Sequence, residues 1–338
     1  MTPHKFPYNW TLKDASFTKD KGTVFSCFAC GGGSTMGYKL AGFDVIGCNE
    51  IDPKMIDSYK INHDPKFAFL EPIQTFKLRK DLPAELYNLD ILDGSPPCSS
   101  FSMAGNREKD WGKEKVFREG QAEQILDTLF FDFIDLAKEL QPKIIVAENV
   151  AGMMMGTAKE YVKKVYTEFT AAGYKLRIEP YLLDASKMGV PQRRKRVFFI
   201  AIRNDLAGQF MAPVDMFQTA PKLDLEFNEP EIAIKTFCEF EDKKPTINYR
   251  ENRFGDVILD LNRASNTITT GVRFWLNEKQ TLKKHCYNLI GSYPMDYKFN
   301  SDNVYLIGMS VPPVMVANIA TNIYKQWLKP LKINNKIN

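Results

Sequence analysis

A cysteine that follows two prolines is the first residue of this chain whose surroundings indicate chemistry. Cys98 ends the run Asp90–Pro97, in which a β-prone stretch leads into a rigid Pro-Pro step. Because ligands of open α/β sheets bind beyond the carboxyl ends of strands, we expect this thiol to face a site. A lone cysteine is most often an inert buried side chain. Here serines and prolines surround it in place of an apolar pattern, which favours a nucleophile.

Glu148 is the second reactive group and has a similar setting. It follows the apolar, β-prone run Ile144–Ala147 directly. A carboxyl group at the end of such a strand, in partly apolar surroundings, can hold a proton at neutral pH and act as an acid.

A basic segment, Gln192–Arg196, precedes the β-prone run Val197–Ile202. Alternation along a strand would direct Arg194 and Arg196 to one face. Such a pair can clamp a base or a phosphate, although a solvated basic surface patch is the alternative.

A glycine-rich loop, Phe28–Gly33, lies between a predicted strand and a predicted helix. Glycines allow the backbone to pass close to a ligand without a Cβ clash. Glu50 ends the next predicted strand, where a carboxylate can accept hydrogen bonds from the ribose hydroxyls of a nucleoside cofactor. A tight turn in an α/β core is the alternative.

The elements that must position these residues alternate along the first 200 residues. Predicted strands cover residues 23–28, 43–48, 89–92, 143–147 and 197–202, and predicted helices cover 34–41, 121–140 and 162–172, with another beginning at Pro53. A further helix is predicted near the end of the chain, at 311–328. Strands interleaved with helices predict a doubly wound, mainly parallel α/β sheet.

The chain changes character after Arg203. From Asn204 to Asn262 the periodicity weakens and prolines recur, which indicates a smaller, irregular domain. We therefore expect a main domain at 20–203, a second, smaller domain at 204–262 that extends at most to about residue 300, and a segment at 301–330 that returns to the main domain.

Composition restricts the partners. The 338 residues carry a net charge of +4, with basic clusters at 107–118, 187–196 and 273–285, which permits a nucleic-acid partner; the first cluster could form a lid over an anionic polymer. Six cysteines and three histidines offer one CxxC pair, Cys27 and Cys30, too few ligands for a four-ligand zinc site, so we expect no metal. No run approaches about 18 apolar residues and the start lacks an apolar leader, so we expect no membrane segment and a cytoplasmic location.

Taken in order, these segments resemble the cytosine carbon-5 DNA methyltransferase family of prokaryotic restriction-modification systems. The resemblance spans nearly the whole chain. The matching segments are Phe28–Gly33 for the cofactor loop, Pro97-Cys98 for the nucleophile motif, Glu148-Asn149-Val150 for the ENV motif, Gln192–Arg196 for the QxRxR motif, and Asn266–Thr269 and Gly308–Pro312 for the last two motifs.

The resemblance implies a Rossmann-like, S-adenosylmethionine-dependent fold. It also implies that the domain at 20–203 is the catalytic and cofactor-binding domain, that 204–262 is the target-recognition domain, and that individual residues have specific roles. The Cys98 thiolate would add to carbon 6 of a flipped cytosine, and Glu148 would bond ring nitrogen 3 and the exocyclic amine. Arg194 would hold the base's carbonyl oxygen and lower the thiol pKa, with Arg196 in support. The residues implied to bind the cofactor are Phe28, Ala29, Gly32, Gly33, Glu50, Ile51, Ile73, Ser95, Ser310 and Val311.

The chain departs from the family pattern at four positions near the cofactor. Ser26 and Pro72 stand where the family has aspartates, Cys30 where it has glycine, and Met309 where it has asparagine.

The expected substrate is double-stranded DNA, methylated by a monomer with no stable protein partner, with a restriction endonuclease as a genetic companion. Two alternatives share the family: a tRNA cytosine-5 methyltransferase and a catalytically inactive DNA-binding relative. Amino-methyltransferases of DNA fit less well, because Ser95–Cys98 carries a thiol where their motif has an aromatic residue.

Overall fold

The computed structural model describes residues 4, 10–97, 114–115, 124–125, 128–155, 158–211, 220–242, 248–250, 255–300 and 302–334. Cys98 and most of the basic segment 107–118 lie outside these residues.

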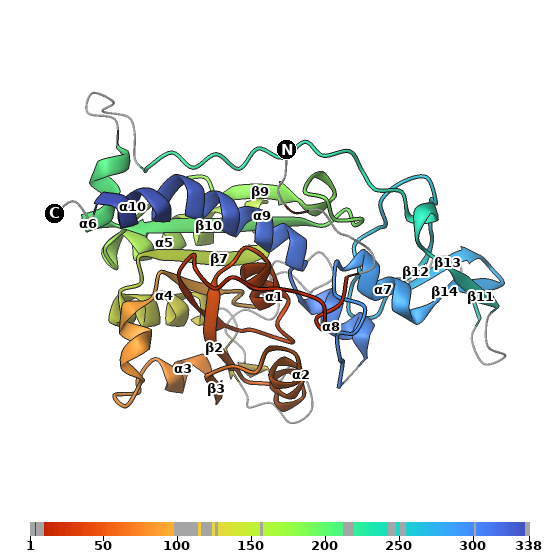
Figure 1. The fold of residues 1–338 in the computed structure, drawn as a ribbon, viewed down its shortest axis with the longest axis horizontal. Coiled ribbons are helices and arrows are strands. Elements are labelled where there is room, and N and C mark those ends of the chain that lie inside the picture. The colour runs from red at the N-terminus through yellow and green to blue at the C-terminus, as the bar shows by residue number, and fades with distance from the viewer. Residues whose placement is uncertain are drawn as a thin grey trace.

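The main sheet has eight strands in the order β3-β2-β1-β4-β7-β10-β8, with β9 paired to β10 (Figure 1). The strands are β1 (Thr23–Cys27), β2 (Asp44–Glu50), β3 (Phe67–Leu70), β4 (Ile91–Gly94), β7 (Ile144–Val150), β8 (Tyr174–Leu176), β9 (Tyr181–Asp184) and β10 (Lys195–Arg203). Strands β3, β2, β1, β4 and β7 pair in parallel, whereas β10 is antiparallel to β7, β8 and β9.

Helices cover both faces of this sheet, as the alternation of strands and helices predicts. On one face, α4 (Leu129–Leu140) and α5 (Ala158–Ala171) pack on Phe25, Leu92, Ile145 and Phe199. On the other, α1 (Gly33–Leu40) and α9 (Pro313–Ile323) pack on Val24, Ile91, Val146 and Phe198. The doubly wound, mainly parallel α/β fold is confirmed.

The local predictions are confirmed for five strands, and several helix ends follow their sequence signals. Pro53 is the first residue of α2 (Pro53–His63), where Asp52 caps the helix by accepting from the amide of Lys54 at 2.8 Å. Gly173, just past α5, has a φ of 94°, a left-handed conformation that favours glycine. Strand β7 continues to Val150, so Glu148 lies inside the strand and does not end it.

The helix predicted over 121–140 is wrong in its first part. Helix α4 begins at Leu129, and Gln124–Ile125 instead form strand β6, paired with β5 (Glu114–Lys115). Helical spacing of apolar residues extended the prediction beyond the segment that packs on the sheet, because periodicity does not mark where a helix starts.

The C-terminal helices return to the main sheet. Helix α8 (Asn303–Met309) is followed by α9, a π-helical turn at Tyr324–Leu328 and α10 (Lys329–Asn334). The stretch Asn303–Ile333 is long and apolar enough for a membrane span, with a mean hydropathy of 1.5, contrary to expectation; 78% of the relevant window is buried in the protein. A buried core helix meets the same criterion.

A second sheet forms at the other end of the molecule from α6 (Asn204–Ala207) (Figure 1). Its strands are β11 (Phe240–Asp242), β12 (Asp256–Ile258), β13 (Arg273–Asn277) and β14 (Gln280–Leu282), in the order β11-β14-β13-β12. Helix α7 (Lys284–Ile290) follows it. An extended segment, residues 220–233, leads there across the C-terminal helices. Within it, the backbone amide of Asp224 donates to the Gln326 side chain at 2.8 Å, and the Asp224 carbonyl accepts from the same side chain at 2.9 Å.

Candidate active site and cofactor pocket

Four strands bring polar side chains to one face of the main sheet, near the edge where the parallel strands β1, β4 and β7 end and the antiparallel strand β10 begins. Ser26 of β1 is the register partner of Asp93 on β4, and Glu148 of β7 is the register partner of Phe198 on β10. Because alternate residues share a face, Arg196 lies on the same face as Glu148. Helices α1 and α9 cover this face. We call Ser26, Asp93, Glu148 and Arg196 the polar row; the apolar residues further along the same strands belong to the core on this face.

Glu148 and Arg196 form a largely buried ion pair. The Nε atom of Arg196 lies 2.9 Å from Oε1 of Glu148, with 14% and 11% of their side chains exposed. The family resemblance implied only a supporting role for Arg196. When the two groups lie side by side, the carboxyl group can accept a hydrogen bond from a donor on a planar ring, and the guanidinium can donate one to an acceptor on the same ring.

Asn149 connects this pair to the segment that carries Cys98. Its Nδ2 donates to the carbonyl of Pro96 at 2.9 Å, and its Oδ1 accepts from the amide of Val150 at 2.9 Å. The chain two residues before Cys98 is therefore held against the strand that bears Glu148.

Arg194 is buried but faces backbone. Its two terminal nitrogens donate to the carbonyls of Ile268 and Gly308 at 2.9 and 2.8 Å, and the side chain is 2% exposed. Gln192 accepts from the amide of Ile268 at 3.1 Å. These contacts join the segment at 192–194 to the two downstream segments that the resemblance singled out.

A cavity opens beside the polar row, between the glycine-rich loop and α8. The described residues that line it are Phe28, Cys30, Glu50, Ile51, Asp52, Met55, Ser95, Pro97, Tyr305 and Met309. Four of the predicted cofactor residues are among them: Phe28, Glu50, Ile51 and Ser95. The described lining carries two carboxyl groups, two aromatic rings and no basic side chain, which suits a cationic, partly aromatic ligand better than a phosphate-bearing one.

Glu50 shapes the inner wall of this cavity. Its carboxyl group accepts from the backbone amides of Cys30 (2.7 Å), Ile51 (2.8 Å) and Asp52 (2.9 Å). Burial raises the pKa of Glu50 although these three bonds oppose the shift. A carboxylate has about four acceptor positions, so one remains for a ligand hydroxyl.

The glycines of the loop are required by the protein's own packing. A Cβ atom on Gly31 would lie 2.2 Å from the Leu306 side chain, one on Gly32 2.2 Å from His63, and one on Gly33 2.6 Å from the carbonyl oxygen of Val311. The glycines were expected to allow the close approach of a ligand; the described contacts show that protein atoms occupy those positions.

A hydrogen-bonded pair holds the outer side of the same loop. The Tyr297 hydroxyl donates to the carbonyl of Gly31 and lies 2.9 Å from Nε2 of buried His63. The hydroxyl has one proton, which it donates to Gly31, so towards His63 the hydroxyl oxygen can only accept. Nε2 of His63 therefore carries a proton and donates it to Tyr297.

The other predicted cofactor residues support the cavity from outside its described lining. Ala29 packs on Cys48, Ile56 and Tyr59, and Ile73 lies in the core at the start of α3 (Ile73–Phe76). Ser310 and Val311 contact Gly33. The role predicted for each of them stays a prediction.

Six lining residues were absent from the predicted cofactor set: Cys30, Asp52, Met55, Pro97, Tyr305 and Met309. Asp52 and Met55 directly follow the Glu50 segment, and Tyr305 and Met309 are four residues apart on α8. Helical spacing near a predicted cofactor segment was the signal available for the last two.

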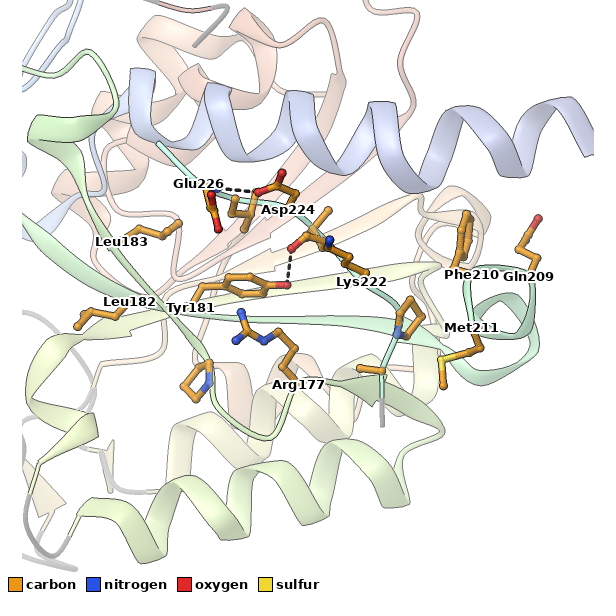
Figure 2. Close-up of a pocket in the computed structure, with 15 residues that line it drawn as sticks. Arg177, Tyr181, Leu182, Leu183, Gln209, Phe210, Met211, Lys222, Asp224 and Glu226 are labelled. Atoms are coloured by element: carbon orange, nitrogen blue, oxygen red, sulfur yellow. Dashed lines mark hydrogen bonds between the residues drawn. The ribbon is translucent and has the colours of Figure 1, made fainter. Parts of the chain in front are cut away.

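A larger groove lies elsewhere and contains none of the predicted site residues (Figure 2). It runs between β9 and the extended segment, where Tyr181 donates to the carbonyl of Leu223 at 2.9 Å and the Arg177 guanidinium stacks over the Tyr181 ring at 4.5 Å.

Comparison with known proteins identifies the family of the chain. The family described as "C-5 cytosine-specific DNA methylase" matches residues 22–284. The chain belongs to this family.

Individual relatives within the methylase family match over a shorter stretch. Type II methyltransferase M.FnuDI of Fusobacterium nucleatum is 35% identical over 183 residues, 54% of this chain and 47% of the relative. M.NgoPII of Neisseria gonorrhoeae is 36% identical over 191 residues, 56% of this chain and 50% of the relative. The chain spans about half the length of these curated relatives.

Solved structures match along nearly the whole chain. One, titled as a DNA modification methyltransferase encoded within a prophage (E. coli), has a TM-score of 0.62 at 20% identity and covers 90% of this chain and 99% of its own. The S. pombe Dnmt2 methyltransferase gives a TM-score of 0.60 at 18% identity, covering 92% and 99%. At such identities the likeness shows the fold.

The structure accounts for part of the departures from the methylase pattern. Ser26 donates to Asp93 at 2.8 Å, so a carboxyl group is present on the neighbouring strand. Cys30 has a φ of 49°, a conformation that glycine adopts more easily. Burial, with Glu50 nearby, raises the pKa of Cys30 to about 12. Met309 lines the cavity, whereas Pro72 precedes α3 and is not part of the described lining.

Proposed function

We propose that this protein is a DNA cytosine-5 methyltransferase of the restriction-modification type. The observation that carries the proposal is the juxtaposition of the Glu148–Arg196 pair with the Pro96-Pro97 segment that leads into Cys98, beside a cavity lined by carboxyl groups. Membership in the C-5 cytosine-specific methylase family supports it.

The cofactor we propose is S-adenosylmethionine, which supplies an electrophilic methyl group. Glu50 would bind its ribose hydroxyls, Phe28 would contact its adenine, and the acidic, cation-free lining would favour its positive charges. The fit rests on the described lining of the cavity.

The residues of the chain would activate the base. The Cys98 thiolate adds to carbon 6 of cytosine, and the electron pair of the C5–C6 double bond becomes available at carbon 5. Glu148 stabilises this adduct by hydrogen bonding at ring nitrogen 3 and the exocyclic amine. After methyl transfer, loss of the proton from carbon 5 expels the thiolate and restores the ring.

We assign the contact with the base's carbonyl oxygen to Arg196 in preference to Arg194. Arg196 pairs with Glu148, whereas both terminal nitrogens of Arg194 already donate to backbone carbonyls. Arg194 would then hold the segments at 268 and 308 in place.

The substrate would be a short sequence of double-stranded DNA, from which the target base is flipped out at a cost of a few kcal/mol. The second sheet, within the predicted recognition region, would read the sequence. A monomer in the cytoplasm, without a stable protein partner, suffices for this activity.

Bisulfite sequencing tests the proposal. Plasmid DNA incubated with the protein and S-adenosylmethionine should acquire methylcytosine at one recurring short sequence. Methylation of tRNA alone would favour the tRNA branch of the family, and methylation of amino groups would overturn the proposal.

A covalent trap tests the role of Cys98 separately. A duplex with 5-fluorocytosine at the target should become irreversibly attached to the wild type, because fluorine at carbon 5 blocks the elimination. Cys98→Ser should form no adduct while still binding S-adenosylmethionine. Adduct formation by Cys98→Ser would refute the assignment of the nucleophile.

A further inference from the structure

Asp93 is a buried carboxyl group that the proposed reaction does not use. It lies on β4, is 4% exposed, and accepts from Ser26 Oγ at 2.8 Å and from Tyr38 Oη at 3.1 Å. Both donors are neutral hydroxyls. Within the described ranges, no lysine or arginine forms an ion pair with it. A buried carboxylate without a cation is costly, so its presence calls for a compensating positive charge.

The surroundings of Asp93 make its charge responsive to a new cation. Burial raises the pKa of Asp93 to about 7, with Glu148 adding to the shift and the two hydroxyls opposing it. A positive charge arriving nearby would therefore both favour the carboxylate and be stabilised by it.

The position of Asp93 indicates where that cation would bind. Ser26 and Asp93 are register partners at the ends of β1 and β4. Phe28 and Ser95, the residues that directly follow β1 and β4, line the cavity. Two residues of extended chain span about 7 Å at most, so the backbone of Asp93 lies within that distance of the backbone of Ser95. Over such a distance in a partly buried site, a charge interaction remains strong.

We propose that Asp93 is an electrostatic positioning residue for the cofactor: its buried negative charge makes the pocket prefer the sulfonium donor over the neutral thioether that remains after transfer. This inference rests on the proposed function. The preference would keep the methyl donor bound before transfer and weaken the hold on the product afterwards.

Isothermal titration of the two ligands tests the inference without reference to turnover. The Kd values for S-adenosylmethionine and S-adenosylhomocysteine are measured for wild type, Asp93→Asn and the control Tyr38→Phe. Asp93→Asn should weaken binding of the sulfonium ligand about tenfold and of the thioether less than threefold. Tyr38→Phe keeps the carboxyl group and should preserve the wild-type preference.

Exchange variants keep the test decisive if Asp93→Asn does not fold. Ser26→Asp with Asp93→Ser moves the carboxyl group to the facing strand and should retain the preference, whereas Ser26→Asn with Asp93→Ser should lose it. Equal weakening of both ligands, or no change, would show a structural role and overturn the inference. If the wild type binds neither ligand, it is the proposed function that fails.

Discussion

Arg196 reaches Glu148 because its strand runs in the opposite direction to its neighbour. The 2.9 Å contact joins the first residues of β10 to the last residues of β7, and these two strands pair antiparallel. Most residues of this site follow a strand, since parallel strands end at the same edge. An arginine at the start of its strand reaches that edge only if the strand is antiparallel, and this explains why the basic segment 192–196 lies at the beginning of β10.

The Glu148–Arg196 pair should stabilise the fold as well as contact the base. Removing one partner of a buried pair leaves an unpaired charge, so Arg196→Met should lower the free energy of unfolding by about 3 kcal/mol. Urea denaturation of Arg196→Met, Glu148→Gln and the double variant measures the coupling. The double variant should lose less than the sum of the two single losses. The exposed pair Lys163–Glu160 provides the control, for which Lys163→Met should change little.

Substitution of the two buried arginines should affect different properties: stability for Arg194 and the rate of adduct formation for Arg196. Arg194→Lys loses hydrogen bonds to two backbone carbonyls and should destabilise the protein by about 2 kcal/mol, while the fluorocytosine adduct still forms at a similar rate. Arg196→Lys should slow adduct formation at least tenfold, because a point charge replaces a forked donor. Rapid-quench measurement of adduct formation, beside urea denaturation, distinguishes them. The opposite pattern would return the base contact to Arg194.

Gly32 should be far less replaceable than Gly173, although both have positive φ angles of 92° and 94°. A Cβ on Gly32 would meet His63 at 2.2 Å, whereas one on Gly173 would meet nothing within 4 Å. Gly173→Ala should cost about 1 kcal/mol from backbone strain alone. Gly32→Ala should cost at least about 3 kcal/mol and weaken binding of S-adenosylmethionine. Similar losses in the two variants would contradict the packing role of Gly32.

Stability should depend on pH through Asp93 in a direction that burial fixes. Its pKa is raised from 3.8 to about 7, so the folded protein retains a proton that the unfolded chain releases. The stabilising contribution is fully present below pH 3.8 and is lost as the pH rises through 7, by at most about 4 kcal/mol. The difference in unfolding free energy between wild type and Asp93→Asn should therefore move in favour of the variant from pH 5 to pH 8. A constant difference would show that Asp93 does not titrate in this range.

The sequence was sufficient to predict elements whose pattern is local. Strands β1, β2, β4, β7 and β10 show apolar, β-prone runs, and Phe28, Glu50, Ile51 and Ser95 lie at or just beyond the ends of these strands. The short strands β3, β8 and β9 were not predicted; three or four residues give little periodicity, and β4 was the one strand of that length in the main sheet that the sequence revealed.

The remaining features depend on contacts between distant parts of the chain. The partner of Arg194 is the carbonyl of Gly308, and the partner of Ser26 is Asp93. No local pattern records that an arginine will face backbone, or that two strands will share one buried carboxyl group. Tyr305 and Met309 reach the cavity only because α8 packs on the glycine loop.

The contact between α1 and α9 has a consequence for synthesis. Gly37 of α1 packs against the carbonyl of Pro313, and Gly33 against that of Val311, almost 280 residues later. A ribosome that has made only the first 203 residues has produced every β-strand of the main sheet but only one of the two walls that enclose the glycine loop. The growing chain should therefore be unable to complete the proposed cofactor pocket until α8 and α9 have emerged from the exit tunnel.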